Sequence, residues 1–198
     1  MNLTVNDHNI FLVILVTFIT SVLLVPIVKK VAEHVGAMDI PNARKVHDHP
    51  IPRMGGLAIF GAFLLGYMLF ARSSLQMLSI LIGGFIIVLM GIFDDIKPIS
   101  ARYKFILQIV AAAVVVFYGN IVLSRVTVFG LNIVFPNVVS QIITILFIVG
   151  ITNAINLIDG LDGLASGVSS IYFMTITIVA FILNKMQGLD TMLSLIML

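Results

Sequence analysis

The chain has 198 residues, of which 60% are hydrophobic and only 10% are charged, and its formal net charge is +2. Soluble domains contain about 45–50% apolar residues, so this composition indicates a membrane protein. The lack of cysteine excludes disulfides, thiolate metal sites and cysteine nucleophiles. The eleven basic residues stand in short segments between apolar runs, which favours a role in membrane topology and argues against nucleic-acid binding.

Uncharged apolar runs recur along the whole chain, each close to the about 17–25 residues that a transmembrane helix needs. They lie at about 9–28, 54–71, 77–93, 105–123, 138–155 and 165–183, and a further run begins near Met192. Because backbone polar groups must be satisfied internally in lipid, such runs without strict alternation predict helices and not a β-barrel. We therefore predict an all-α polytopic transmembrane helix bundle with six full spans and the start of a seventh. It forms one membrane-embedded domain over 1–198, truncated at its C-terminal end.

The basic residues divide unevenly between the segments that join these runs. Eight of the eleven fall at 29–53 and 94–104, and the remaining segments hold three. Since positive charge stays on the cytoplasmic side, the N-terminus is expected outside and these two segments inside, together with 156–164. Seven of the nine acids share the cytoplasmic side, so we expect the active face there. The outer segment 124–137 has some alternation and is able to form a short hairpin.

An adjacent acidic pair, Asp94 and Asp95, ends the third run. The C-terminal end of a helix already carries about half a negative charge, so two carboxylates there need compensation. We expect a divalent cation, a nearby basic residue, or both; the basic candidates are Lys97, Arg102 and Lys104. Carboxylate oxygens with open water positions suit Mg²⁺ that also binds phosphate.

A second polar group lies where the fifth run ends, with amide or carboxylate side chains at every third position. They are Asn153, Asn156, Asp159 and Asp162. Ionisable groups at membrane depth are costly and usually functional, so we assign the aspartates to a polar site shared with the acidic pair. The asparagines also have a structural alternative, hydrogen bonding between helices. Gly160 and Gly163 are expected to end the helix.

The first cytoplasmic segment, at 39–56, combines prolines with basic residues and histidines. Lys45 and Arg53 are suited to phosphate contacts, and Gly55-Gly56 permits close approach of the backbone to an anion. The alternative is that the basic residues only attract anionic lipid and set topology. His47 and His49 lack a third ligand nearby, so we do not expect them to hold a metal.

Three motifs together resemble one enzyme family: DIPNARKVHDHPIPRMGG at 39–56, GIFDD at 91–95 with a lysine nine residues beyond, and ITNAINLIDGLDGLASG at 151–167. They are similar to the polyprenyl-phosphate N-acetylhexosamine-1-phosphate transferases, over essentially the whole chain. The first motif is closer to the branch that uses UDP-N-acetylglucosamine, which includes the enzyme that primes wall teichoic acid. The resemblance implies transfer of N-acetylglucosamine-1-phosphate from a UDP-sugar to undecaprenyl phosphate, with release of UMP. This is the first membrane step of cell-wall or surface polysaccharide synthesis.

The resemblance also implies roles for individual residues. Asp94 and Asp95 are the expected catalytic residues, with Asp94 activating the lipid phosphate, and Asp95 and Asn156 are the expected metal ligands. The expected substrate-binding residues are Lys45, Arg53, Lys104, Asn153, Asp159 and Asp162. Mg²⁺ is the expected cofactor, with Mn²⁺ as an allowed substitute. The expected location is the plasma membrane, the expected partners are the UDP-sugar, the polyprenyl phosphate and membrane lipid, and a homodimer is allowed.

Relatives of this kind have a further aspartate and a histidine-rich loop in a second half, which would follow Leu198. We therefore expect residues 1–198 to insert into a membrane but to hold only part of the site. Two alternatives remain, a cation transporter with a cytoplasmic acidic cluster and an inactive fragment of the transferase. Transporters place ionisable groups near the midplane, whereas here they gather at one face. The CDP-alcohol phosphotransferases use a related D-G-x-x-A-R motif, but its arginine is missing from DGLDGLASG.

Overall fold

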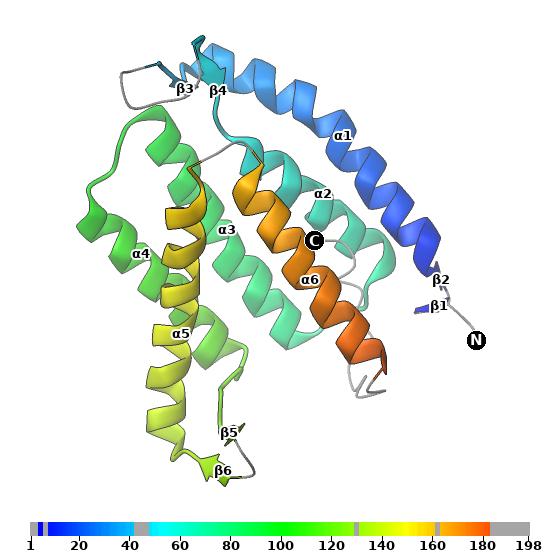
Figure 1. Cartoon of the computed structure of the whole chain (residues 1–198), viewed down its shortest axis with the longest axis vertical. Helices are drawn as coiled ribbons and strands as arrows, with labels where there is room; N and C mark the ends of the chain where they lie inside the picture. Colours follow the sequence, from blue (N-terminus) through cyan, green and yellow to red (C-terminus); the bar gives the residue numbers. More distant parts are fainter. Residues whose placement is uncertain (1–3, 6–7, 42–47, 129–130, 161–162, 183–198) are drawn as a thin grey trace. The chain divides into compact units, whose positions relative to one another are not determined.

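The computed structural model describes residues 4–5, 8–41, 48–128, 131–160 and 163–182. Within these ranges the chain is mostly helical (Figure 1), and a helix lies on each of the six predicted runs. The helices are α1 (Ile10–Val35), α2 (Gly55–Phe70), α3 (Leu75–Ile96), α4 (Ala101–Ala113) continued by the π-helix η1 (Val114–Tyr118), α5 (Asn137–Ile158) and α6 (Leu164–Ile182). The prediction of a helical membrane protein is confirmed to this extent.

Four of these helical segments are long and apolar enough to cross a bilayer. They are α1, α3, the continuous stretch Ala101–Tyr118, and α5. The α2 helix and the Leu164–Val179 part of α6 are also apolar but have fewer than 18 residues. Large side chains of α1 such as Phe11 and Phe18 are 66% and 65% exposed, which is typical of a surface that faces lipid. The count of six spans and the outward N-terminus stay predictions, and the seventh run lies outside the described residues.

In the part of the chain that the structure describes, three short antiparallel hairpins add strands that an all-α prediction does not include. They pair β1 (Thr4–Val5) with β2 (His8–Asn9), β3 (Met38–Asp39) with β4 (Ile51–Pro52), and β5 (Arg125–Val128) with β6 (Leu131–Val134). All three lie between or before the helices, where extended backbone satisfies its own polar groups by pairing. The β5–β6 hairpin falls within 124–137 and confirms the hairpin expected there.

The chain forms two compact units, of which the first comprises Met1–Arg72, Val88–Ile99 and Ser170–Leu198. In this unit α1 packs along α2 (Figure 1). Small side chains make the contact close: Ala32, Ala37 and Ala58 are almost completely buried, and the buried Met54 packs with them. Small residues at a helix interface let two backbones approach, which is how helices associate without a hydrophobic driving force in lipid.

The second unit comprises Ser73–Ile87 and Ser100–Ser169, and α4 packs against α5 within it (Figure 1). Polar side chains connect its elements. The backbone N–H of Leu123 donates to the hydroxyl oxygen of Thr144 at 2.8 Å, and Gln108 of α4 is hydrogen-bonded to Asn153 of α5. The α3 helix runs from this unit into the first, where its last turns carry the acidic pair.

Candidate active site at the end of helix α3

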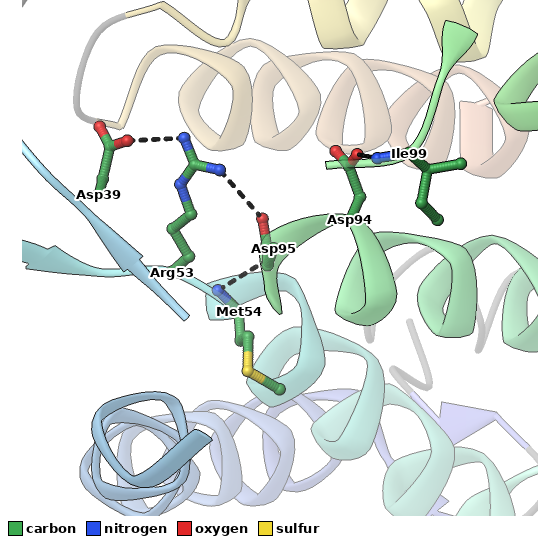
Figure 2. A network of polar contacts seen from close by, with 6 residues as sticks. All are labelled: Asp39, Arg53, Met54, Asp94, Asp95 and Ile99. Atoms are coloured by element: carbon green, nitrogen blue, oxygen red, sulfur yellow. Dashed lines mark hydrogen bonds and ion pairs between the residues drawn. The ribbon is translucent and has the colours of Figure 1, made fainter. Parts of the chain in front are cut away.

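The acidic pair lies in the last turn of α3, as the sequence predicts. The helix ends at Ile96 because Pro98 disfavours helical backbone at the residue before it and cannot donate a hydrogen bond itself. The Oδ1 atom of Asp94 accepts a hydrogen bond of 2.8 Å from the backbone N–H of Ile99 (Figure 2). Asp94 therefore stabilises the turn that follows the helix.

Asp95 faces a different partner, the start of α2. Its Oδ2 atom accepts a hydrogen bond of 3.1 Å from the backbone N–H of Met54, and its Oδ1 atom lies 3.9 Å from Nη1 of Arg53. The Nη2 atom of Arg53 donates to Oδ1 of Asp39 at 2.6 Å. Figure 2 shows Asp39, Arg53 and Asp95 in a row, with Asp94 turned away from them toward Ile99. We call Asp39, Arg53, Met54 and Asp95 the arginine network.

The β3–β4 hairpin explains how residues far apart in the chain meet in this network. Asp39 pairs with Ile51 in the antiparallel register, and the backbone N–H of Arg53 donates to the carbonyl oxygen of Ala37 at 2.9 Å. The hairpin thus holds Arg53 beside the strand that carries Asp39. The role of Asp39 was not predicted from the sequence. The one feature that could have indicated it is an acid placed just before a basic segment that contains prolines.

Met54 has an unusual backbone, with φ at +72° in the left-handed region. A non-glycine residue there costs about 1–2 kcal/mol, and such residues gather at functional sites. Met54 caps the start of α2 without a side-chain hydrogen bond of its own, and its side chain is buried. Its N–H is one of the donors that a helix start leaves unpaired, and Asp95 of another helix supplies the acceptor.

The electrostatic consequence is that Asp95 receives positive partners from two sources. Arg53 supplies a full charge, and the N-terminal end of α2 supplies the positive end of a helix dipole. Together they offset the negative end of α3, on which the pair lies. The side chains of Asp39, Asp95 and Arg53 are 21%, 27% and 38% exposed, so the network is half-buried and still reached by water. Arg53 therefore compensates part of the charge of the pair, and compensation by Lys97, Arg102 or Lys104 stays a prediction.

A cavity of about 400 Å³ adjoins the arginine network in the first unit. Its lining combines the basic or titratable side chains Lys29, His49 and Arg53 with one acid, Glu33, and with apolar residues of α1, α2 and the hairpin. A cavity with this mixture of cationic and apolar walls suits an anionic group attached to an apolar body.

The remaining predicted site residues fall in three groups. Lys45 and Asp162 lie outside the described residues. Asn156 and Asp159 are exposed at the C-terminal end of α5, where Asp159 caps the helix just before Gly160. Gly163, whose φ is +76°, directly precedes α6. Lys104 lies in the first turn of α4. Since these residues belong to the second unit, their participation in one site with Asp94 and Asp95 stays a prediction.

Asn153 makes the interhelical contact that was the alternative to substrate binding. Its Nδ2 donates to Oε1 of Gln108 at 2.6 Å and to the carbonyl oxygen of Val149 at 2.8 Å. The Nε2 of Gln108, a side chain only 6% exposed, donates back to Oδ1 of Asn153 at 3.4 Å. The reciprocal pair fixes α4 against α5, one turn from Asn156. A substrate contact of Asn153 stays a prediction.

We expect Gln108→Leu to lower the stability of the protein by about 0.6–2 kcal/mol, because the half-buried amide of Asn153 then loses its partner across the helices. Asn153→Leu should have a similar effect, and the double variant should lose much less than the sum of the two. The measurement is thermal unfolding in detergent, followed by far-UV circular dichroism. Strictly additive effects of the two substitutions would show that the pair contributes nothing.

The carboxylates of Asp94 and Asp95 are the oxygen donors that Mg²⁺ prefers. Among the described residues no group of three or more histidine, aspartate or glutamate side chains is close enough to hold a metal by protein ligands alone. Mg²⁺ is commonly held by one or two carboxylates, with waters and substrate phosphates completing the octahedron. The residues present therefore fit a Mg²⁺ site that is completed by a phosphorylated substrate.

Comparison with known proteins assigns the chain to a family. A family model described as glycosyl transferase family 4 matches residues 77–198, which is more than half of the chain and includes the acidic pair. The chain belongs to glycosyl transferase family 4.

Individual relatives in the family agree with the motif resemblance. The probable undecaprenyl-phosphate N-acetylglucosaminyl 1-phosphate transferase of Bacillus subtilis (strain 168) is 41% identical over 177 residues, covering 87% of this chain and 48% of that protein. The decaprenyl-phosphate N-acetylglucosaminephosphotransferase of Mycobacterium tuberculosis (strain ATCC 25618 / H37Rv) is 36% identical over 83% of this chain and 44% of that protein. The undecaprenyl-phosphate alpha-N-acetylglucosaminyl 1-phosphate transferase of Thermotoga maritima is 33% identical over 77% of this chain and 45% of that protein.

These relatives confirm the family that the three motifs indicated. The chain spans about half the length of the curated relatives it matches. With its four long apolar helices, this member of glycosyl transferase family 4 is a multi-pass membrane protein.

Proposed function

We propose that this family 4 protein transfers N-acetylglucosamine-1-phosphate from UDP-N-acetylglucosamine to undecaprenyl phosphate at the cytoplasmic face of the cell membrane. UMP leaves, and the lipid-linked product enters synthesis of wall teichoic acid or another surface polysaccharide. The observation that carries the proposal is the half-buried acidic pair at the end of α3, held in two directions by Ile99 and by the arginine network. The names of the relatives support the sugar and the polyprenyl acceptor.

The reaction exchanges one phosphorus–oxygen bond for another. An oxygen of the lipid phosphate bonds to the sugar-bearing phosphorus, and the bond from that phosphorus to the bridging oxygen breaks. UMP departs with the electron pair. In such reactions catalysis is mostly positioning and charge stabilisation. Asp94 takes the proton of the lipid phosphate, so that its oxygen attacks as an anion.

The metal has a limited and specific part in this proposal. Mg²⁺, or Mn²⁺ as a substitute, would be held by Asp95 and Asn156, and it would neutralise charge on the diphosphate. The chain's own basic residues perform the rest of the phosphate recognition. Lys29 and His49 in the cavity beside the arginine network are in a suitable place for the anionic head of a lipid.

The direct test is release of UMP by the purified complete gene product that carries residues 1–198. UDP-N-acetylglucosamine, undecaprenyl phosphate and Mg²⁺ are supplied, and the lipid product is detected by mass spectrometry. Release of UMP that depends on both the lipid phosphate and the metal supports the proposal. No release, together with cation flux in proteoliposomes, would favour a transporter, and release of CMP from a CDP-alcohol would favour the other phosphotransferase class.

Lys104→Ala should weaken binding of the nucleotide-sugar more than it slows the chemical step. A lysine is a flexible point charge for a diphosphate, and a lost charged hydrogen bond corresponds to about a 10-fold or greater rise in KM. The measurement is a steady-state titration with UDP-N-acetylglucosamine. Lys30→Ala, which removes an exposed lysine of α1, is the control and should leave KM unchanged. An unchanged KM in Lys104→Ala would reduce Lys104 to a residue that sets topology.

A further inference from the structure

We propose that Arg53 is a positioning residue that fixes the carboxylate of Asp95, and that Asp39 in turn holds Arg53. This assignment differs from the phosphate contact that the sequence suggests for Arg53. It rests on the proposed transferase function, because it concerns the residue pair that performs the reaction. It also gives Asp39 a role that sequence analysis did not foresee.

The guanidinium group of Arg53 links two carboxylates. Its two terminal nitrogens lie in one rigid plane, so a short bond at one of them sets the direction of the other. The bond from Nη2 to Asp39 is short, at 2.6 Å, whereas Nη1 lies 3.9 Å from Asp95. Asp39 is therefore the anchor of the arginine, and the second nitrogen is directed at Asp95 (Figure 2).

The backbone that carries this side chain is held rigidly on both sides. The backbone of Arg53 is bonded to Ala37, which is completely buried. The side chain of the next residue, Met54, is buried, and its backbone N–H donates a hydrogen bond to the Oδ2 atom of Asp95. Both oxygens of Asp95 thus face groups that belong to one small unit of the fold. Catalytic groups need such supporting contacts to stay within a productive geometry.

The charges of the network also depend on Arg53. One guanidinium stands between two half-buried carboxylates, those of Asp39 and Asp95. Removal of Arg53 would take away the cation between these carboxylates, and Asp95 would lose one of the contacts that fix its orientation. A rotated Asp95 carboxylate no longer points in the direction that its role beside Asp94 requires. A substitution of Arg53 should therefore act on the chemical step, through Asp95, more than on substrate binding.

The test compares Arg53→Gln, Arg53→Lys and Asp39→Asn in the complete gene product, with kcat and KM measured for UDP-N-acetylglucosamine and for undecaprenyl phosphate. Arg53→Gln should lower kcat by about 10–100-fold, the usual effect of losing a supporting contact, while both KM values stay within about twofold. Asp39→Asn should lower kcat in the same way but less. Arg53→Lys keeps the charge without the fork and should fall between the unsubstituted protein and Arg53→Gln. Lys30→Gln is the matched control for loss of a surface charge and should change neither constant.

A coupling measurement separates positioning from independent action. In an Asp95→Asn background, Arg53→Gln should cause at most about a twofold further loss of turnover, because two residues that act through one group are not additive. If Arg53→Gln does not fold, Arg53→Lys and Asp39→Asn are each combined with Asp95→Asn in its place.

Three outcomes are distinguishable. If the unsubstituted protein releases no UMP, the proposed function fails and this inference fails with it. If it turns over, and Arg53→Gln raises a KM about 10-fold with kcat unchanged, Arg53 is a phosphate ligand and only the positioning role is overturned. A full multiplicative loss in the Asp95→Asn background would overturn it as well.

Discussion

Asp94→Asn and Asp95→Asn should each lower Mg²⁺-dependent transfer by at least about 100-fold, the effect expected on losing a catalytic or charge-stabilising group. An amide is nearly the same size as a carboxylate, but it does not take up a proton at neutral pH and, being uncharged, it binds Mg²⁺ more weakly than a carboxylate does. The assay follows radiolabelled UDP-N-acetylglucosamine into the lipid fraction. Near-normal turnover of either variant would remove that residue from the mechanism.

The structure predicts that the two variants differ in stability. An asparagine at position 94 keeps an oxygen that accepts the hydrogen bond from Ile99, so the turn after α3 should persist. An asparagine at position 95 keeps an acceptor for Met54 but loses its charge partner, Arg53. Asp95→Asn should therefore have the lower melting temperature of the two, although both insert into the membrane. Asp48→Asn, which changes an exposed acid of the segment 39–56, is the control for both assays.

Gly119→Ala should destabilise the protein by about 1–3 kcal/mol, the usual result of adding volume to a well-packed site. Gly119 is buried and follows the π-helix η1, with an ordinary backbone φ of −81°. A Cβ atom there would lie 2.0 Å from the hydroxyl oxygen and 2.8 Å from Cβ of Ser79, which is completely buried in α3. It would also lie 2.7 Å from the carbonyl oxygen of Val115. The cost thus comes from space and not from the dihedral angle.

The control for this prediction is Gly150→Ala in α5, where an added Cβ meets no heavy atom within 4 Å. Alanine is the better helix former by about 1 kcal/mol, so this control should be neutral or slightly stabilising. Melting temperatures in detergent of the two variants and the unsubstituted protein give the comparison. Equal melting temperatures would show that the segment after η1 has room for a methyl group beside α3.

The position of each helix could be predicted from the sequence because the backbone in lipid must satisfy its polar groups internally, and a helix does this within one segment. Runs such as 77–93 therefore predicted α3 to within a few residues. The placement of Asp94 and Asp95 in the last turn of α3 followed from the same run. The alternation within 124–137 was also enough to indicate the β5–β6 hairpin, because its two strands are neighbours in sequence.

Contacts between distant segments were beyond the reach of pattern alone. Asp39 and Arg53 are 14 residues apart, and Met54 and Asp95 are 41 apart, so no local periodicity relates them. The sequence suggested a phosphate contact for Arg53 or a role in topology, and the fold brings two carboxylates within its reach. For Asn153 it likewise left interhelical bonding and substrate binding open, and the packing of α4 on α5 put Gln108 beside it.

The sequence by itself thus determined the membrane-helical class, the family and the identity of the acidic pair, since each depends on residues that are adjacent or regularly spaced. Only the tertiary structure decided what surrounds that pair. The register of the β3–β4 hairpin brings Arg53 to Asp39, and the packing of α1 on α2 buries Met54 and holds the start of α2 at Asp95. The sequence shows that a carboxylate is present, but the compensation of its charge depends on its distance from a cation. For residues far apart in the chain, that distance is set by packing.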